Sequence, residues 1–120
     1  MKHTIGITTK GYKGIGMEGF IARSYDKNAR KLQMGVYKTY LPSLGNHLKE
    51  GSRVLEIAPG PGYMAIELSR LGHYSITGLD VSKTFVEIAR RNAEEAGVRI
   101  EFELGDVANI PHPSNTFDFI

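Results

Sequence analysis

The chain has 120 residues, 41% of them hydrophobic and 23% charged, proportions that are ordinary for one globular domain. Its net charge of +2 is too small, and its Lys and Arg residues are too scattered, to indicate nucleic-acid binding. The absence of cysteine excludes disulfides, thiolate metal sites and a cysteine nucleophile. No apolar run is long enough for a signal peptide or a membrane span, so we expect a soluble, cytoplasmic protein.

Residues 1–50 are predicted to form an arm followed by helices, ahead of a separate domain at 51–120. Residues 1–16 are rich in glycine, threonine and lysine, which predicts a mobile arm. From residue 17 to 47, apolar side chains recur at three- and four-residue spacings typical of helices. Pro42 and Gly45 interrupt this pattern, so we expect two or three short helices there.

Residues 53–57 predict a strand that is buried on both faces, and Glu56 is the one charge in its apolar part. The strand runs into the tight turn Ala58-Pro59-Gly60-Pro61-Gly62, and a helix is expected from Tyr63. Glycine accepts positive φ and lets a ligand approach the main chain. The N–H groups of residues 58, 60, 62 and 63 are expected to be available to an anionic or dipolar ligand. This turn therefore predicts a cofactor loop of the nucleotide-binding type.

The remaining residues alternate between helix and strand patterns. Residues 99–104 alternate apolar and charged side chains, which is typical of a strand at the edge of a sheet. The expected elements, in order, are a helix 63–71 closed by Gly72, a strand 74–79 followed by Asp80, a helix 83–96 capped by Ser82 and closed by Gly97, a strand 99–104, and the start of a strand at 117–120.

This spacing predicts an α/β fold in which right-handed crossovers join the strands of a parallel sheet. Ligands of such sheets bind beyond the carboxyl ends of the strands. Glu56, Asp80 and Asp106 all fall at or near those ends. Three carboxylates are therefore expected to converge on one rim, facing the Gly/Pro turn.

Three segments, 54–62, 79–82 and 105–118, resemble the class I S-adenosylmethionine (SAM) methyltransferases, especially the branch with the ubiquinone and menaquinone biosynthesis enzymes. The first is similar to the family's acid-x-Gly-x-Gly-x-Gly motif, with Ala58 in place of the first glycine. The second resembles the acidic step after the second strand, and the third the loop that leads into the fourth. The resemblance covers about residues 52–120 and implies a Rossmann-like parallel sheet, truncated after the start of its fourth strand.

The resemblance implies a cofactor role for several of these residues. Glu56 would hold the amino group of SAM, directly or through water. Asp80 would accept both ribose hydroxyls, with Val81 packed on the adenine face. Asp106 would accept the adenine amino group, with Val107 in contact with the ring. Each carboxylate also has a structural alternative: saturation by backbone N–H groups for Glu56, and turn or capping roles for the two aspartates.

The turn residues Ala58, Gly60 and Gly62 belong to the same implied cofactor site, where the Ala58 side chain would narrow the approach of the methionine moiety. Residues 1–50 would form a lid over the cofactor, with Tyr12 and Tyr25 near its mouth, although ordinary packing is the alternative for both tyrosines.

The four histidines lack the spacing of metal ligands, so no metal site is expected. His112, which stands between two prolines, is predicted to be exposed.

These observations predict the SAM-binding portion of a methyltransferase that acts on an unidentified small-molecule acceptor, with S-adenosylhomocysteine as product and no assignable catalytic base. A nicotinamide-binding oxidoreductase is the first alternative, since Gly60-x-Gly62-x-x-Ala65, with Asp80 downstream, fits a relaxed dinucleotide fingerprint. The second alternative is a non-catalytic SAM-binding or self-associating module. Because the resemblance stops inside a strand, we expect little activity from this chain alone. We also expect homo-oligomers, joined through the edge at 117–120 or by exchange of the N-terminal helices.

Overall fold

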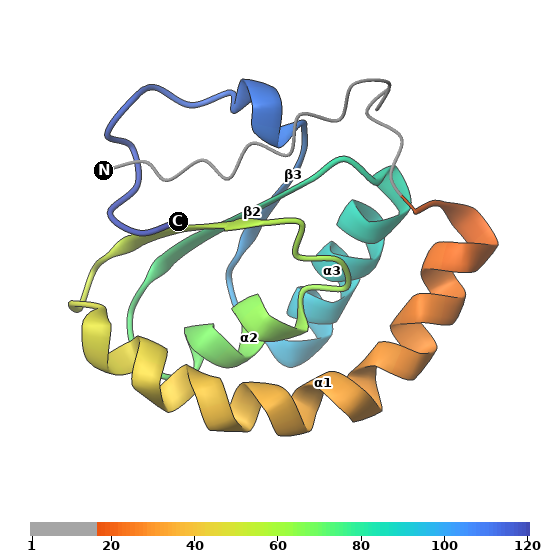
Figure 1. The fold of residues 1–120 in the computed structure, drawn as a ribbon, viewed down its shortest axis with the longest axis horizontal. Helices are drawn as coiled ribbons and strands as arrows, with labels where there is room; N and C mark the ends of the chain where they lie inside the picture. The colour runs from red at the N-terminus through yellow and green to blue at the C-terminus, as the bar shows by residue number, and fades with distance from the viewer. Residues whose placement is uncertain (1–16) are drawn as a thin grey trace.

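The predicted alternation of strands and helices is present in the structure, a computed structural model that describes residues 17–120 (Figure 1). The predicted arm, and Tyr12 with it, lies outside the described residues. The elements in chain order are α1 (Gly19–His47), β1 (Arg53–Ile57), α2 (Tyr63–Ser69), β2 (Ser75–Asp80), α3 (Lys83–Ala96), β3 (Glu101–Leu104) and a 3-10 turn (Val107–Asn109).

The three strands form a parallel sheet in the order β1-β2-β3, so the α/β expectation and the edge position of β3 are confirmed. Residues 118 and 119 lie beside the other edge of β1, where Val54 and Phe119 form a parallel bridge. The Leu55 N–H donates to the Phe119 carbonyl at 2.9 Å, and the Asp118 N–H donates to that of Arg53 at 2.8 Å. The predicted fourth strand therefore begins next to β1.

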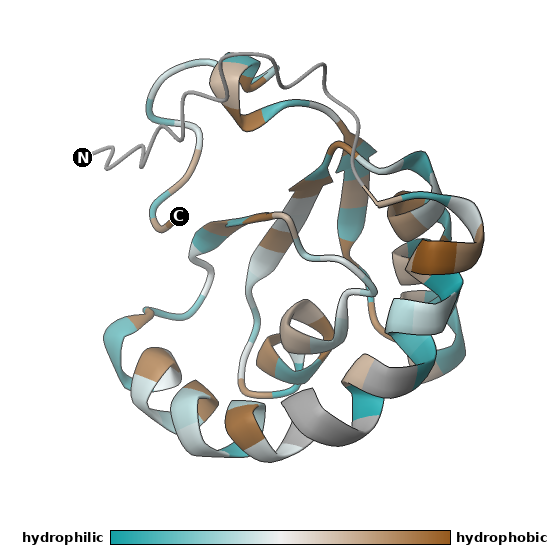
Figure 2. Cartoon of the chain, turned by 45° about the vertical axis from the view of Figure 1, so that its right-hand side comes forward, coloured by the Kyte–Doolittle hydropathy of each residue, from teal (hydrophilic) through white to brown (hydrophobic). Residues whose placement is uncertain are grey.

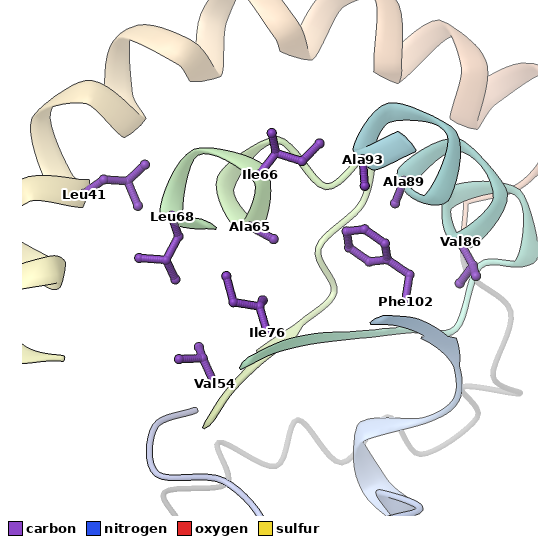
Figure 3. Close-up of a cluster of buried hydrophobic side chains, with 10 residues drawn as sticks. All are labelled: Leu41, Val54, Ala65, Ile66, Leu68, Ile76, Val86, Ala89, Ala93 and Phe102. Atoms are coloured by element: carbon purple, nitrogen blue, oxygen red, sulfur yellow. The ribbon is translucent and has the colours of Figure 1, made fainter. Parts of the chain in front are cut away.

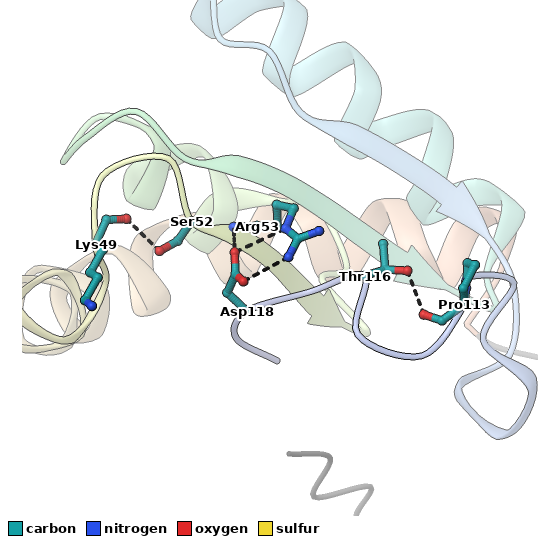
Figure 4. Close-up of polar contacts among 6 residues, drawn as sticks. All are labelled: Lys49, Ser52, Arg53, Pro113, Thr116 and Asp118. Carbon is teal, nitrogen blue, oxygen red and sulfur yellow. Dashed lines mark hydrogen bonds and ion pairs between the residues drawn. The ribbon is translucent and has the colours of Figure 1, made fainter.

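An ion pair fixes the start of this segment (Figure 4). The Asp118 carboxylate accepts from the Arg53 backbone N–H at 2.8 Å and from its guanidinium at 3.1 Å. Both side chains are about half exposed, so the pair contributes little free energy, but it sets the register of residues 118–119 against β1.

Helices α2 and α3 cover one face of the sheet, and α1 packs across these two helices (Figures 1 and 3). The buried side chains between them form one core, to which α1, both covering helices and all three strands contribute: Leu41, Val54, Ala65, Ile66, Leu68, Ile76, Val86, Ala89, Ala93 and Phe102. Figure 2 shows hydrophobic residues recurring along the strands and on the turns of the helices. This burial of apolar surface is the main force that holds the layers together.

One continuous helix, α1, replaces the two or three short helices predicted before residue 48, so that prediction is wrong. Pro42 has no N–H to donate to the carbonyl of Lys38, which weakens the helix at that turn. Leu41 is buried and Leu44 packs against the same core, so tertiary contacts hold the helix together on both sides of the proline. No helix within residues 17–120, α1 included, is long and apolar enough to cross a membrane.

The predicted end of α2 is also wrong, whereas α3 matches its prediction. Helix α2 ends at Ser69, because its last turn tightens and the Leu71 N–H donates to the Leu68 carbonyl at 3.0 Å. Gly72 has a packing role instead, since a Cβ there would lie 2.9 Å from the Tyr74 ring. Helix α3 runs from Lys83 to Ala96, with Ser82 as its N-cap and Gly97, at φ +71°, at its end.

Candidate functional site

A cleft of about 690 Å³ opens at the carboxyl end of β1 and continues along its edge. Five of the eight predicted site residues line it: Glu56, Ala58, Val81, Asp106 and Val107. The other three, Gly60, Gly62 and Asp80, do not line the cleft, and they belong to the turn and the strand end that support it. The rest of the wall is largely apolar and includes Leu44, Val54, Met64, Leu68, Phe119 and Ile120.

Glu56 is the group in this cleft whose bonding is incomplete. Both carboxylate oxygens are buried and neither has a hydrogen-bond partner among the described residues. Burial, and secondarily the charge of Asp80, raises the pKa of Glu56 to about 7. Saturation by backbone N–H groups is therefore not what this structure shows. A buried carboxylate without partners is costly, and a cationic ligand group would remove that cost.

Asp80 has the structural role that the sequence left open as its alternative. It is buried, and its carboxylate accepts from the Gly60 N–H at 3.0 Å and from the Ser82 N–H at 2.9 Å. One side chain thereby ties the turn after β1 to the start of α3. Each carboxylate oxygen can accept more than one hydrogen bond, so this role leaves room for a ligand hydroxyl.

The turn after β1 has three residues in the left-handed region: Ala58 at φ +55°, Gly60 at +56° and Gly62 at +84°. Gly60 would have open space around a Cβ, so only its φ requires glycine. Gly62 is also restricted by packing, because a Cβ there would lie 2.8 Å from Cζ of Phe102. Ala58 adopts a conformation that an L-residue disfavours, at the position where the resembled motif has glycine.

The prediction of four free N–H groups in this turn is wrong for three of them. Each donates within the protein: Ala58 to the Leu79 carbonyl at 2.9 Å, Gly60 to Asp80, and Gly62 to the Pro59 carbonyl at 3.0 Å. The turn closes on itself and on β2, which turns these donors away from a ligand. The fourth, Tyr63, is at the first residue of α2, where a helix has no carbonyl of its own to receive the N–H.

On the opposite wall, the segment after β3 is held in place by two side chains. Asp106 accepts from the Ala108 N–H at 2.9 Å and caps the 3-10 turn, so its turn role is real as well. His112 is partly buried, which contradicts the predicted exposure. Its Nε2 lies 2.8 Å from Oε2 of Glu103, and its ring packs edge-on against Phe117. Sequence gave no signal for this contact between a loop histidine and the third strand.

The start of α1 is bound to the start of α3, next to the end of β2. The Ser82 hydroxyl donates to the Met17 carbonyl, and the Thr84 N–H donates to the Glu18 carboxylate at 3.0 Å. Tyr25 packs edge-on against Phe85, with ring centres 5.6 Å apart, so the packing alternative for this tyrosine is present. Within residues 17–120, no group of three acidic or histidine side chains is placed to hold a metal ion.

Residues 54–120 match the family model described as "Methyltransferase domain". A ubiquinone/menaquinone biosynthesis C-methyltransferase of Bdellovibrio bacteriovorus is 34% identical over 101 residues, which is 82% of this chain and 43% of that protein.

Among solved structures, a proposed SAM-dependent methyltransferase of Methanococcus maripaludis superposes with a TM-score of 0.80 at 30% identity, covering 87% of this chain and 49% of that one. A SAM-dependent methyltransferase from Geobacter sulfurreducens, solved with S-adenosyl-L-homocysteine, superposes with a TM-score of 0.50 at 38% identity. The match covers 57% of this chain and 29% of that one. The chain spans half or less of the length of these relatives.

We expect Ala58→Gly to stabilise the protein by about 0.5–1 kcal/mol. Removing the Cβ relieves the left-handed conformation of residue 58, which stabilises the folded state by roughly 1–2 kcal/mol. Glycine also raises the conformational entropy of the unfolded chain, which offsets part of this gain. Ala58→Val should destabilise, because a β-branched side chain fits positive φ still less well. Urea unfolding of the three proteins measures both effects, and a glycine variant no more stable than the parent would contradict the strain at Ala58.

The free energy of unfolding should fall as pH rises from about 4.5 to 7, because folded Glu56 binds its proton more tightly than the unfolded chain does. The fall from this group is at most about 3 kcal/mol. Glu56→Gln should remove most of it, whereas Glu101→Gln, at an exposed position on β3, should leave it unchanged. Denaturation curves at pH 5 and pH 8 test this, and equal pH dependence in both variants would refute it.

Proposed function

The chain belongs to the class I SAM-dependent methyltransferases, in the branch similar to the ubiquinone and menaquinone biosynthesis enzymes, and we propose that its cleft binds SAM. The observation that carries this proposal is the Glu56 carboxylate, which lies buried in the cleft wall with both oxygens unpaired. The amino group of SAM is a cation with N–H donors, so it would supply the charge and the hydrogen bonds that Glu56 lacks.

Of the other predicted contacts, Val81, Asp106 and Val107 line the same cleft, and Asp80 lies at the strand end that supports it. Val81 and Val107 line it and offer apolar contact to the adenine ring, beside Asp106, which would accept the adenine amino group. Asp80 would accept the ribose hydroxyls with the lone pairs that its two backbone donors leave. Each aspartate therefore combines a structural bond with a ligand bond, which pre-orients it for the ligand.

When bound, SAM supplies the difficult chemistry as a methyl group activated by its sulfonium. The chain's own residues would bind and orient the reactants and keep water away from the reacting atoms. The apolar wall of the cleft, which includes Val54, Met64 and Phe119, supports a small-molecule acceptor with an apolar ring, in line with the quinone named for the relative. We propose a cytoplasmic location for this activity, and the lid role of residues 1–50 stays a prediction.

The nicotinamide alternative receives little support from the turn. A dinucleotide pyrophosphate binds through free backbone N–H groups at the Gly-rich turn. Here the N–H groups of Ala58, Gly60 and Gly62 all donate within the protein. The unpaired Glu56 carboxylate would moreover repel an anion in the same cleft.

We expect S-adenosylhomocysteine to bind and NAD not to bind in calorimetric titrations under the same conditions. Since the ammonium group of the ligand requires ionised Glu56, its affinity should rise about tenfold from pH 6 to pH 8. Asp80→Ala should weaken binding by about 1–3 kcal/mol, because the ribose hydroxyls lose their acceptor. It should also lower stability, because it frees two backbone donors, so binding is measured well below the melting temperature.

Arg99→Ala is the matched control for this titration, since Arg99 is exposed in the segment before β3, does not line the cleft and should not affect either ligand. Tighter binding of NAD than of S-adenosylhomocysteine would overturn the SAM site. Equal affinities of the Asp80 and Arg99 variants would reduce Asp80 to a turn residue.

We further propose that the chain self-associates through the edge of residues 117–120. One side of this segment pairs with β1, and the side chains of Phe119 and Ile120 remain 39% and 48% exposed. An exposed apolar strand edge favours pairing with a second chain.

Light scattering after size exclusion, at roughly tens of micromolar, should therefore show a dimer or larger species. Phe119→Lys should shift the protein to monomer, because a charged edge resists pairing. Phe20→Lys, at an 80% exposed position on α1, should leave the assembly unchanged. A monodisperse parent monomer, or equal effects of both substitutions, would refute this interface.

A further inference from the structure

The turn after β1 has one hydrogen bond within itself, from the Gly62 N–H to the Pro59 carbonyl at 3.0 Å, and little other local support. Gly62, the N-cap residue of α2, has no side chain to cap the helix. Three residues of the turn have positive φ, and one of these is an alanine. Contacts from elsewhere in the fold must therefore keep the turn in this shape.

Two side chains hold the turn from the helix side. The Tyr63 hydroxyl, at the start of α2, donates to the Asp26 carboxylate of α1. The Asn92 amide, on α3, donates to the Pro61 carbonyl at 3.0 Å. Together with Asp80, which bonds the Gly60 N–H from the other side, these groups tie the turn to β2, α1 and α3.

The bond between Tyr63 and Asp26 is built to persist at neutral pH. Burial, and next to it the bond to Asp26, raises the pKa of Tyr63 to about 12, so the phenol remains a donor. Asp26 accepts this bond across 37 positions of sequence, which makes it a tertiary contact between two helices. The Asp26 side chain is itself partly buried, so loss of its donor would leave a carboxylate poorly paired.

We propose that Asp26 and Tyr63 are positioning residues, whose hydrogen bond couples the docking of α1 to the ligand-binding shape of the turn at residues 58–62. Neither residue lines the cleft, so each acts on a ligand through the turn. This inference rests on the proposed function for its effect on SAM-site affinity. The coupling between α1 and the turn, however, is a property of the ligand-free protein and can be measured there.

Hydrogen exchange of the ligand-free protein tests the coupling. The amides of Gly60 and Gly62 are both bonded within the protein and should be protected. Tyr63→Phe and Asp26→Ala should each speed their exchange several-fold, and the double variant should exchange no faster than either. Asp26→Asn should restore protection, because its side-chain carbonyl still accepts from the phenol. Exchange at Ala89, in the core helix α3, reports global unfolding, so the increase at Gly60 and Gly62 should exceed any increase at Ala89.

Affinity for S-adenosylhomocysteine should follow the same pattern, with roughly three- to tenfold losses in the single variants and near-parent affinity in Asp26→Asn. Tyr40→Phe, at an exposed tyrosine of α1, is the matched control and should change neither readout. Unchanged exchange at Gly60 and Gly62, additive effects, or an equal effect of Tyr40→Phe would overturn the positioning role. Faster exchange in the two single variants, together with a parent protein that binds no S-adenosylhomocysteine, would support the coupling while refuting the SAM site.

Discussion

The packing of the Phe102 ring is the constraint on which the site geometry depends. This side chain of β3 fills the space under the turn after β1, and a Cβ on Gly62 would lie 2.8 Å from it (Figure 3). A Cβ on Gly78 of β2 would lie 2.6 Å from the same ring. One aromatic side chain thus sets how close the turn, the central strand and α3 approach one another. A close-packed interior leaves little freedom to shift any of them.

The electrostatics of the cleft follow from that packing. Because the turn uses its N–H groups internally, it offers Glu56 no donors, and the carboxylate stays buried and unpaired. The Asp80 carboxylate accepts a hydrogen bond from the turn, and the Asp106 carboxylate accepts one from the segment that follows β3. The rim is therefore acidic, and its least satisfied group, Glu56, lies near the end of β1. This distribution of charge underlies the proposal of a ligand with a cationic group at one end and an apolar ring at the other.

Local patterns in the sequence determined most of the fold and the identity of the rim. The alternation of strands and helices fixed the parallel sheet, because crossovers of that length allow only one hand and one direction. Helix α3 begins after its N-cap Ser82 and ends before Gly97, as the capping preferences of serine and glycine predict. The carboxylates Glu56 and Asp80 lie where strand ends must place them, since the carboxyl ends of parallel strands share one edge. These features depend on neighbours in the sequence, and neighbours can be read directly.

Only the tertiary structure decided how these groups are bonded, because the partners are distant in sequence. It showed that the turn directs its donors inward, that Glu56 lacks partners, and that Glu103 holds His112. The structure also showed the hydrogen bond between Asp26 and Tyr63. Helix α1 continues through Pro42, because core packing outweighs the hydrogen bond that the proline cannot make. Propensity and motif describe the preference of a short segment. Which preference prevails depends on the packing of segments that the sequence keeps far apart.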